Sequence, residues 1–185
     1  NLKPLNLTTP LQTAEQLPAI LKHQTLKTDR SVSYSFPIPT IEPLYKSKPT
    51  GYIGSLIGHE GEGSLHQLLT RNGWITSLGA GSQNIDQANA YFGIDIGLTE
   101  AGYEQIDAIT DLVFDFIELL QASEPKAYLY DEPATVAELG FRFREQIPSI
   151  ATVQSLAPNL MKYPAEDLLV APYLLEDFDP KVIAT

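Results

Sequence analysis

Two stretches of alternating apolar and polar residues in the middle of the chain predict a pair of antiparallel strands. Trp74 to Leu78 alternates large apolar side chains with small polar ones and runs on into Gly81. Residues 88–98 read ANAYFGIDIGL, which places Phe92, Ile94, Ile96 and Leu98 on one face. We therefore expect strands 74–81 and 88–98 to pair across a turn at residues 82–87.

The N-terminal part of the chain carries weaker strand signals. Residues 19–26 and 31–38 also alternate, and the polar residues 27–30 between them predict a second hairpin. Pro37 and Pro39 should end its second strand, because proline donates no ladder hydrogen bond. Residues 1–18 contain three prolines and no period, so we expect a connector there and a single α+β domain over residues 19–185.

Helical periodicity predicts the elements that pack on these strands. A short helix should begin near Pro49, and Ser64 is a candidate N-cap for a second one. Thr99 should cap a long helix that reaches Gln121, with an apolar stripe on one side. Its members are Ile106, Ile109, Val113, Phe116, Ile117 and Leu120. We expect Trp74 to be largely buried against this helix.

The last third of the chain predicts further helices. They are expected over about 125–143 with a kink or break at Pro133, over 149–161, from Tyr163 onward, and from Asp179-Pro180. In the first of them Leu129, Val136, Leu139 and Phe143 are expected to point inward. The final helix stops at Thr185, which we interpret as a truncated C-terminus.

Composition narrows the class of protein. Lys+Arg 12 against Asp+Glu 23 gives a net charge of −11, which disfavours nucleic acid and anionic lipid as partners. The chain has no cysteine, so it contains neither disulfides nor a thiolate metal site. No apolar run approaches the roughly 20 residues of a membrane span. Residue 1 is Asn rather than Met, so we expect a targeting segment to be missing; cytoplasm and periplasm both remain open.

Candidate chemistry is sparse, and no catalytic residue or metal ligand is predicted. A helical zinc motif needs two histidines four positions apart, but the position four after His59 is Gly63. The other histidines, His23 and His66, lack ligand spacing, so structural or surface roles are favoured. Ser64 lies outside a Gly-x-Ser-x-Gly elbow, and the glycines around it precede no Gly-Lys-Ser/Thr.

Several linked motifs resemble one known family. IGHEGEGSLHQLL (57–69), NGWITSLGAG (72–81) and LTEAGYEQIDAI (98–109) occur in the same order as in the second domain of the insulinase/pitrilysin zinc metallopeptidases. The similarity extends to YSFPIP, KPTGYIGSLIGHE, FRFRE and YPAEDLLVAPYLLEDFDP, and covers roughly residues 30–183. The inverted His-x-x-Glu-His motif of that family's first domain does not occur in this chain.

The resemblance implies a fold and a role. The fold would be α+β, a mixed, largely antiparallel sheet with helices packed mainly on one face, as in the inverted-zincin metallopeptidases. Four such domains enclose a chamber for unfolded peptides, and zinc belongs to the first. The second domain would be non-catalytic and without a cofactor of its own. Its partners would be peptide substrates and the other domains of the same chain, and the whole protein would be a zinc metallopeptidase.

In the insulin-degrading members the second domain also anchors the N-terminus of the substrate. The matching positions here are Gly58, Glu60, Leu78, Gly79, Ala80, Gly81 and Ser82. Three positions depart from that type: Ser55 replaces a histidine, Ala80 a glycine and Ser82 a glutamine. We interpret the strand 75–82 as an edge that binds a peptide by strand addition, with Glu60 receiving the α-amino group. Two alternatives stay open: the glycines merely shape a turn or bulge, or the chain is a structural or interaction domain of a relative without peptidase activity.

Overall fold

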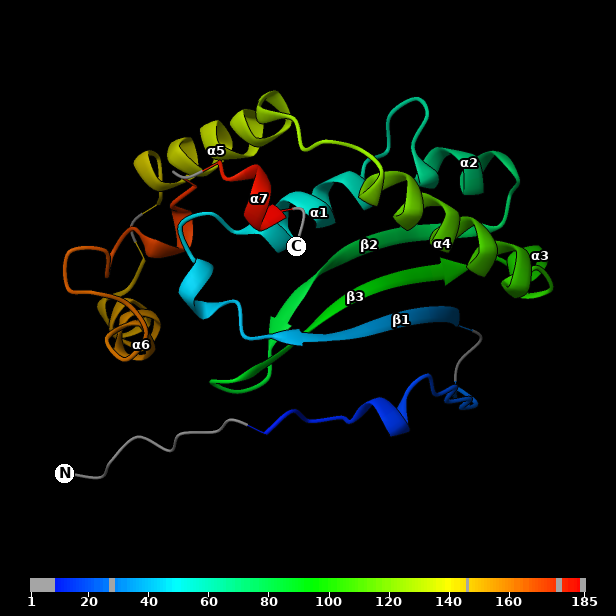
Figure 1. Ribbon diagram of the computed structural model, residues 1–185. Coiled ribbons are helices and arrows are strands. Elements are labelled where there is room, and N and C mark those ends of the chain that lie inside the picture. Colours follow the sequence, from blue (N-terminus) through cyan, green and yellow to red (C-terminus); the bar gives the residue numbers. More distant parts are fainter. Residues whose placement is uncertain (1–8, 27–28, 146, 176–177, 184–185) are drawn as a thin grey trace. The chain divides into compact units, whose positions relative to one another are not determined.

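The computed structural model describes residues 9–26, 29–145, 147–175 and 178–183 (Figure 1). By its internal contacts the chain divides into two compact units, whereas the sequence analysis expects one domain over 19–185. The first, here called the sheet unit, comprises Asn1–Thr40 and Thr50–Glu124. The second, here called the helical unit, comprises Ile41–Pro49 and Pro125–Thr185. Each unit is therefore built from two separate segments of the sequence.

The sheet unit contains three antiparallel strands in the order β1-β3-β2. The strands are β1 (Arg30–Pro39), β2 (Ile75–Asn84) and β3 (Asn89–Leu98). The predicted pairing of β2 with β3 is confirmed and runs from Ile75↔Leu98 to Asn84↔Ala90, with a bulge between Ile75 and Ser77. The predicted N-terminal hairpin is wrong. Residues 19–26 form no strand, and β1 pairs instead with β3.

The turn between β2 and β3 is organised by one carboxylate. Asp86 Oδ1 accepts hydrogen bonds from the backbone N–H groups of Ala88, at 2.7 Å, and Asn89, at 2.9 Å. The buried Asn89 side chain donates to the same carboxylate. These donors, the Ala88 N–H first among them, hold the pKa of Asp86 below its ordinary value.

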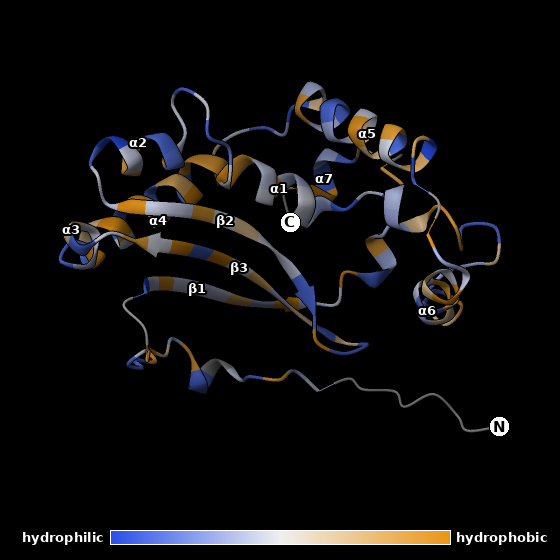
Figure 2. Cartoon of the chain, turned by 180° about the vertical axis from the view of Figure 1, so that it is seen from behind, coloured by the Kyte–Doolittle hydropathy of each residue, from blue (hydrophilic) through white to orange (hydrophobic). Residues whose placement is uncertain are grey.

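Helices cover one face of the sheet, which confirms the α+β class (Figure 1). They are α1 (Pro49–Ile57), α2 (Leu65–Arg71) and α4 (Ile106–Gln121). In Figure 2 the hydropathy colouring shows α1 as partly hydrophobic (orange) and partly near-neutral (white). The buried core between helices and sheet consists of Ile57, Leu65, Leu69, Ile75, Phe92, Ile94, Ile96, Leu98, Ile109 and Val113. The predicted stripe of α4 is confirmed, since its remaining members pack against this cluster.

Two predicted N-caps are confirmed, and one predicted helix is shorter than expected. Ser64 Oγ accepts from the N–H of Gln67, and Thr99 Oγ1 accepts from the N–H of Gly102. Thr99, however, caps only the short helix α3 (Glu100–Tyr103), because Gln105 has non-helical dihedral angles and α4 begins after it. Trp74 packs against the core and is partly buried.

The helical unit consists of α5 (Ala127–Arg142), α6 (Ser149–Asn159), α7 (Pro180–Ile183) and short 3₁₀ turns. Two of these turns are η2 (Glu42–Leu44) and η3 (Ala171–Tyr173). Helix α5 continues through Pro133, and residues 163–170 form turns instead of the expected helix. The predicted inward face of α5 is wrong, because Val136 is 64% exposed and Phe143 73% exposed. The buried residue of α5 is Tyr130, which donates to the Ser47 carbonyl at 2.9 Å.

The short segment 41–49 is tied to the rest of the helical unit by polar contacts. Tyr45 donates to Asp167 Oδ2 at 2.6 Å, and the Lys46 ammonium lies 3.1 Å from the same oxygen. Both interactions hold the pKa of Asp167 below its ordinary value, the Tyr45 bond first. Among the helices of the described residues, none combines the length and the apolar character that a membrane span requires.

Candidate functional site

Strand β2 lies at an edge of the sheet. It pairs with β3 on one side, and within the described residues no strand pairs with its other side. An edge of this kind presents unpaired N–H and C=O groups to a further strand. The predicted site residues Leu78, Gly79, Ala80, Gly81 and Ser82 all lie along it.

The register indicates which residues of β2 face outward. The carbonyl oxygen of Gly81 lies 3.9 Å from where a Cβ of Gly93, its register partner, would stand, so it is directed toward β3. In an antiparallel ladder, residues that point their backbone groups at the partner alternate with residues that point them away. Ala80, and with it Leu78 and Ser82, therefore turns its N–H and C=O groups toward the free edge.

Helix α1 runs beside this edge. Ser82 Oγ and Thr50 Oγ1 lie 2.7 Å apart, and a Cβ at Gly54 would lie 2.7 Å from the Ala80 carbonyl oxygen. Only glycine permits so close an approach of a helix to a strand backbone. The predicted site residue Gly58 stands one turn further along, directly after the last residue of α1. Thus α1 lies along one side of the edge, and at Gly54 no side chain separates the helix from the strand backbone.

The loop between α1 and α2 presents Glu60 to solvent. His59 Nδ1 accepts the N–H of Gly61 at 3.1 Å, and a Cβ at Gly61 would clash with the His59 ring. The ring is therefore folded back over Gly61. Glu60 is exposed, and it forms no ion pair with any other described residue.

The donor set does not fit a zinc ion. One ring nitrogen of His59 is occupied by the Gly61 N–H, His66 belongs to α2, and His23 lies in the exposed segment 19–26. Across residues 9–26, 29–145, 147–175 and 178–183, no three His, Asp or Glu side chains are grouped so that they could hold a metal ion.

Sequence reasoning missed three features of this region. Gly54 and Thr50 escaped notice, although the spacing of Gly54 and Gly58 by four residues places both on one helix face. The third feature is a hollow of about 350 Å³ on the face of the sheet opposite the helices α1, α2 and α4. It is lined by Ser35, Gly81, Ser82, Gln83, Tyr91, Gly93 and Asp95. The only sign of this hollow in the sequence was that small residues recur at every second position of β2 and β3.

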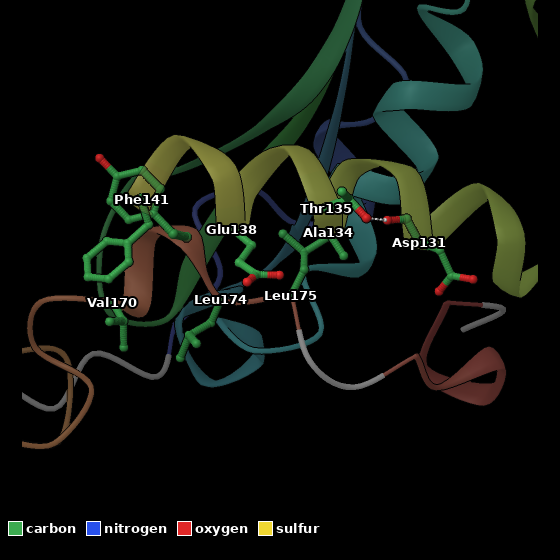
Figure 3. Close-up of a pocket in the computed structure, with 9 residues that line it drawn as sticks. Asp131, Ala134, Thr135, Glu138, Phe141, Val170, Leu174 and Leu175 are labelled. Atoms are coloured by element: carbon green, nitrogen blue, oxygen red, sulfur yellow. Dashed lines mark hydrogen bonds between the residues drawn. The ribbon is translucent and has the colours of Figure 1, made fainter. Parts of the chain in front are cut away.

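The helical unit has a hollow of its own, of about 560 Å³ (Figure 3). Asp131, Thr135 and Glu138 of α5 line it together with apolar side chains. The Thr135 hydroxyl donates to the Asp131 backbone carbonyl at 2.9 Å, so it is engaged within the helix. The lining residues include no histidine, lysine or cysteine that would activate a nucleophile.

Comparison with known proteins identifies the class as a peptidase domain. The description "Peptidase M16 inactive domain" matches residues 2–132, and "Middle or third domain of peptidase_M16" matches residues 141–185. The chain therefore belongs to the M16 peptidase family, the family of insulin-degrading enzyme, nardilysin and pitrilysin.

Individual relatives support this assignment. The chain is 37% identical over 158 residues to insulin-degrading enzyme of Drosophila melanogaster, covering 85% of this chain and 16% of that protein. It is 33% identical over 175 residues to the A-factor-processing enzyme of Saccharomyces cerevisiae, covering 94% and 17%. A crystal structure of pitrilysin has the same fold, with a TM-score of 0.80 at 24% identity over 84% of this chain and 17% of that one. The chain thus spans less than a fifth of the length of these relatives.

Proposed function

We propose that this chain is a non-catalytic part of a zinc-dependent metalloendopeptidase that degrades peptides. It walls the substrate chamber and anchors substrates, while the zinc is held elsewhere in the protein. The match to an inactive M16 domain supports this division of labour. So does the donor set of the described residues, which suits no metal ion. Relatives whose names state that they degrade insulin or process A-factor make a peptide the expected partner.

The observation that carries the proposal is the free edge of β2 beside α1. An extended peptide that adds to this edge gains backbone hydrogen bonds from Leu78, Ala80 and Ser82, whatever its sequence. Side-chain bulk is absent at Gly79 and Gly81, and Gly54 keeps the wall of α1 smooth. Such a site suits a peptidase of unfolded peptides, because it recognises an extended backbone rather than a particular amino-acid sequence.

Glu60 gives the anchored peptide a direction. Its exposed carboxylate lies in the loop that follows Gly58, at the end of the helix that runs beside β2. A free α-amino group is positively charged near neutral pH and is a natural partner for a carboxylate. The N-terminus of the peptide would therefore lie at Glu60 and the following residues along β2.

The experiment is a binding measurement on the 185-residue chain. An unstructured ten-residue peptide with a fluorophore at its C-terminus is titrated, and the fluorescence anisotropy is recorded. Ala80→Pro removes an N–H that faces the edge and leaves the ladder to β3 intact, so we expect binding to weaken about tenfold, the worth of one backbone hydrogen bond. Ala80→Gly, which keeps the N–H, is the matched control and should bind like the parent chain.

A second arm tests Glu60. Acetylating the peptide N-terminus should weaken its binding to the parent chain. It should not weaken binding to Glu60→Gln, in which a neutral amide replaces the carboxylate. If folded Ala80→Pro binds with unchanged affinity, strand addition at β2 is refuted. If acetylation weakens binding equally in both proteins, Glu60 is not the anchor.

A further inference from the structure

The face of the sheet opposite α1, α2 and α4 has a transverse trough where side chains are small or absent. The register places three residues of neighbouring strands in one row, Ser35 on β1, Gly93 on β3 and Gly81 on β2. A Cβ at Gly81 would have no atom within 4 Å, so the β2 end of this row is open. This row forms the floor of the 350 Å³ hollow.

The two walls of the trough differ in chemistry. Asp95 stands on one side, in the row that joins Ser33 to Gly79. Its Oδ1 accepts from Ser33 Oγ at 2.6 Å, and its Oδ2 lies 3.7 Å from where a Cβ of Gly93 would stand, over the floor. The next row on the other side supplies Tyr91 and Gln83.

Among the described residues, none provides a countercharge for the Asp95 carboxylate. It is exposed and forms no ion pair with any described residue, in a chain whose net charge is −11. A hollow with a fixed carboxylate on one wall and an aromatic ring on the other suits a cationic side chain. The carboxylate pairs with the charge, and the ring accommodates the aliphatic stem.

We propose that this trough binds a lysine or arginine side chain of a peptide paired with the free edge of β2, with Asp95 as the recognising carboxylate. The proposal rests on the strand addition proposed above and adds a side-chain preference to it. Alternate residues of an added strand project onto this face, beside Gly79 and Gly81.

The distances permit the contact. Neighbouring strands are about 4.8 Å apart, so an added strand would lie about 10 Å from β3 across β2. Because Gly79 and Gly81 have no side chains, a long side chain can cross β2 unobstructed. Arginine and lysine, extended across this gap, meet a carboxylate that itself projects from β3. Shorter cations, such as histidine, would fall short.

The test compares two ten-residue peptides that differ only in charge. One carries arginine at alternate positions and the other carries citrulline, its neutral isostere; both have a free N-terminus and a C-terminal fluorophore. We expect the 185-residue chain to bind the arginine peptide about fivefold more tightly at low salt, as an exposed ion pair allows. This preference should shrink as the salt concentration rises.

Three variants test which residues cause the preference for the arginine peptide. Asp95→Asn retains an acceptor for Ser33 and should bind both peptides equally. Gly81→Val fills the trough and should also abolish the preference. Asp111→Asn removes an equal charge from an exposed position on α4, over the helix-covered face, and should retain it. Thermal unfolding of each variant verifies its fold.

The outcomes separate the two proposals. Equal binding of both peptides by the parent chain, or a preference that survives in Asp95→Asn, overturns the trough and leaves strand addition standing. Binding of neither peptide by the parent chain overturns strand addition, and the trough with it.

Discussion

Gly102 is the position where a single methyl group should do the most damage. A Cβ at Gly102 would clash with the Trp74 carbonyl oxygen and lie 2.7 Å from its carbonyl carbon. That oxygen accepts the Thr99 N–H at 2.9 Å, so the backbone cannot yield without weakening the bond. Overpacking costs about 1–3 kcal/mol and the hydrogen bond about 1 kcal/mol, while alanine regains about 1 kcal/mol of helix propensity. We expect Gly102→Ala to lower the free energy of unfolding by about 1–3 kcal/mol.

Urea denaturation followed by far-UV circular dichroism measures this change. Gly140→Ala is the control: Gly140 lies within α5, and a Cβ there would meet no atom within 4 Å. Alanine at position 140 should therefore leave stability unchanged or raise it by up to about 1 kcal/mol. A loss below about 0.5 kcal/mol for Gly102→Ala would refute the reasoning, because it would mean that the Trp74 carbonyl moves aside freely.

Two further predictions concern the sheet unit. Trp74→Ala should lower the free energy of unfolding by about 2 kcal/mol, less than the loss of a fully buried tryptophan, because Trp74 is only partly buried. Urea denaturation measures this change, and a loss above about 4 kcal/mol would mean that Trp74 is fully buried. The pKa of Asp86 is lowered on folding, so its carboxylate stabilises the folded chain above the ordinary value of 3.8 and loses this effect as pH falls through the lower folded value. The difference in urea midpoint between the parent chain and Asp86→Asn should accordingly be constant above about pH 5 and shrink in acid, and a pH-independent difference would contradict it.

Local signals in the sequence predicted local structure well. Ser64 and Thr99 are the caps that their side chains suggest, since an N-cap depends only on residues two or three positions away. The stripe of α4 and the β2–β3 pairing followed from periodicity and a short turn. The end of the helix capped by Thr99 could not be predicted. Gln105 interrupts it with a non-helical backbone conformation, and position 105 carries neither the glycine nor the proline that would signal a break.

Features that depend on contacts between residues far apart in the sequence could not be predicted from local patterns. The alternation of residues 19–26 resembles that of β1, but only β1 finds a neighbouring strand. Val136 and Phe143 have helical spacing, yet periodicity cannot state whether a helix face is covered. The candidate site shows the same limit. The family resemblance selected residues 78–82. The outward direction of Ala80 and the trough at Asp95 required the strand register, and the approach of Gly54 to β2 required the packing of α1.

The strand order has a consequence for how the chain assembles. β2 and β3 are joined by a short turn, so their contacts form between near neighbours in sequence. β1 must close on the far side of β3 with partners from Pro39↔Asn89 to Arg30↔Leu98, and the intervening chain includes the segment Ile41–Pro49 that belongs to the helical unit. Loop closure of this kind slows folding. We therefore expect the β2–β3 hairpin to form first and β1 to join it more slowly.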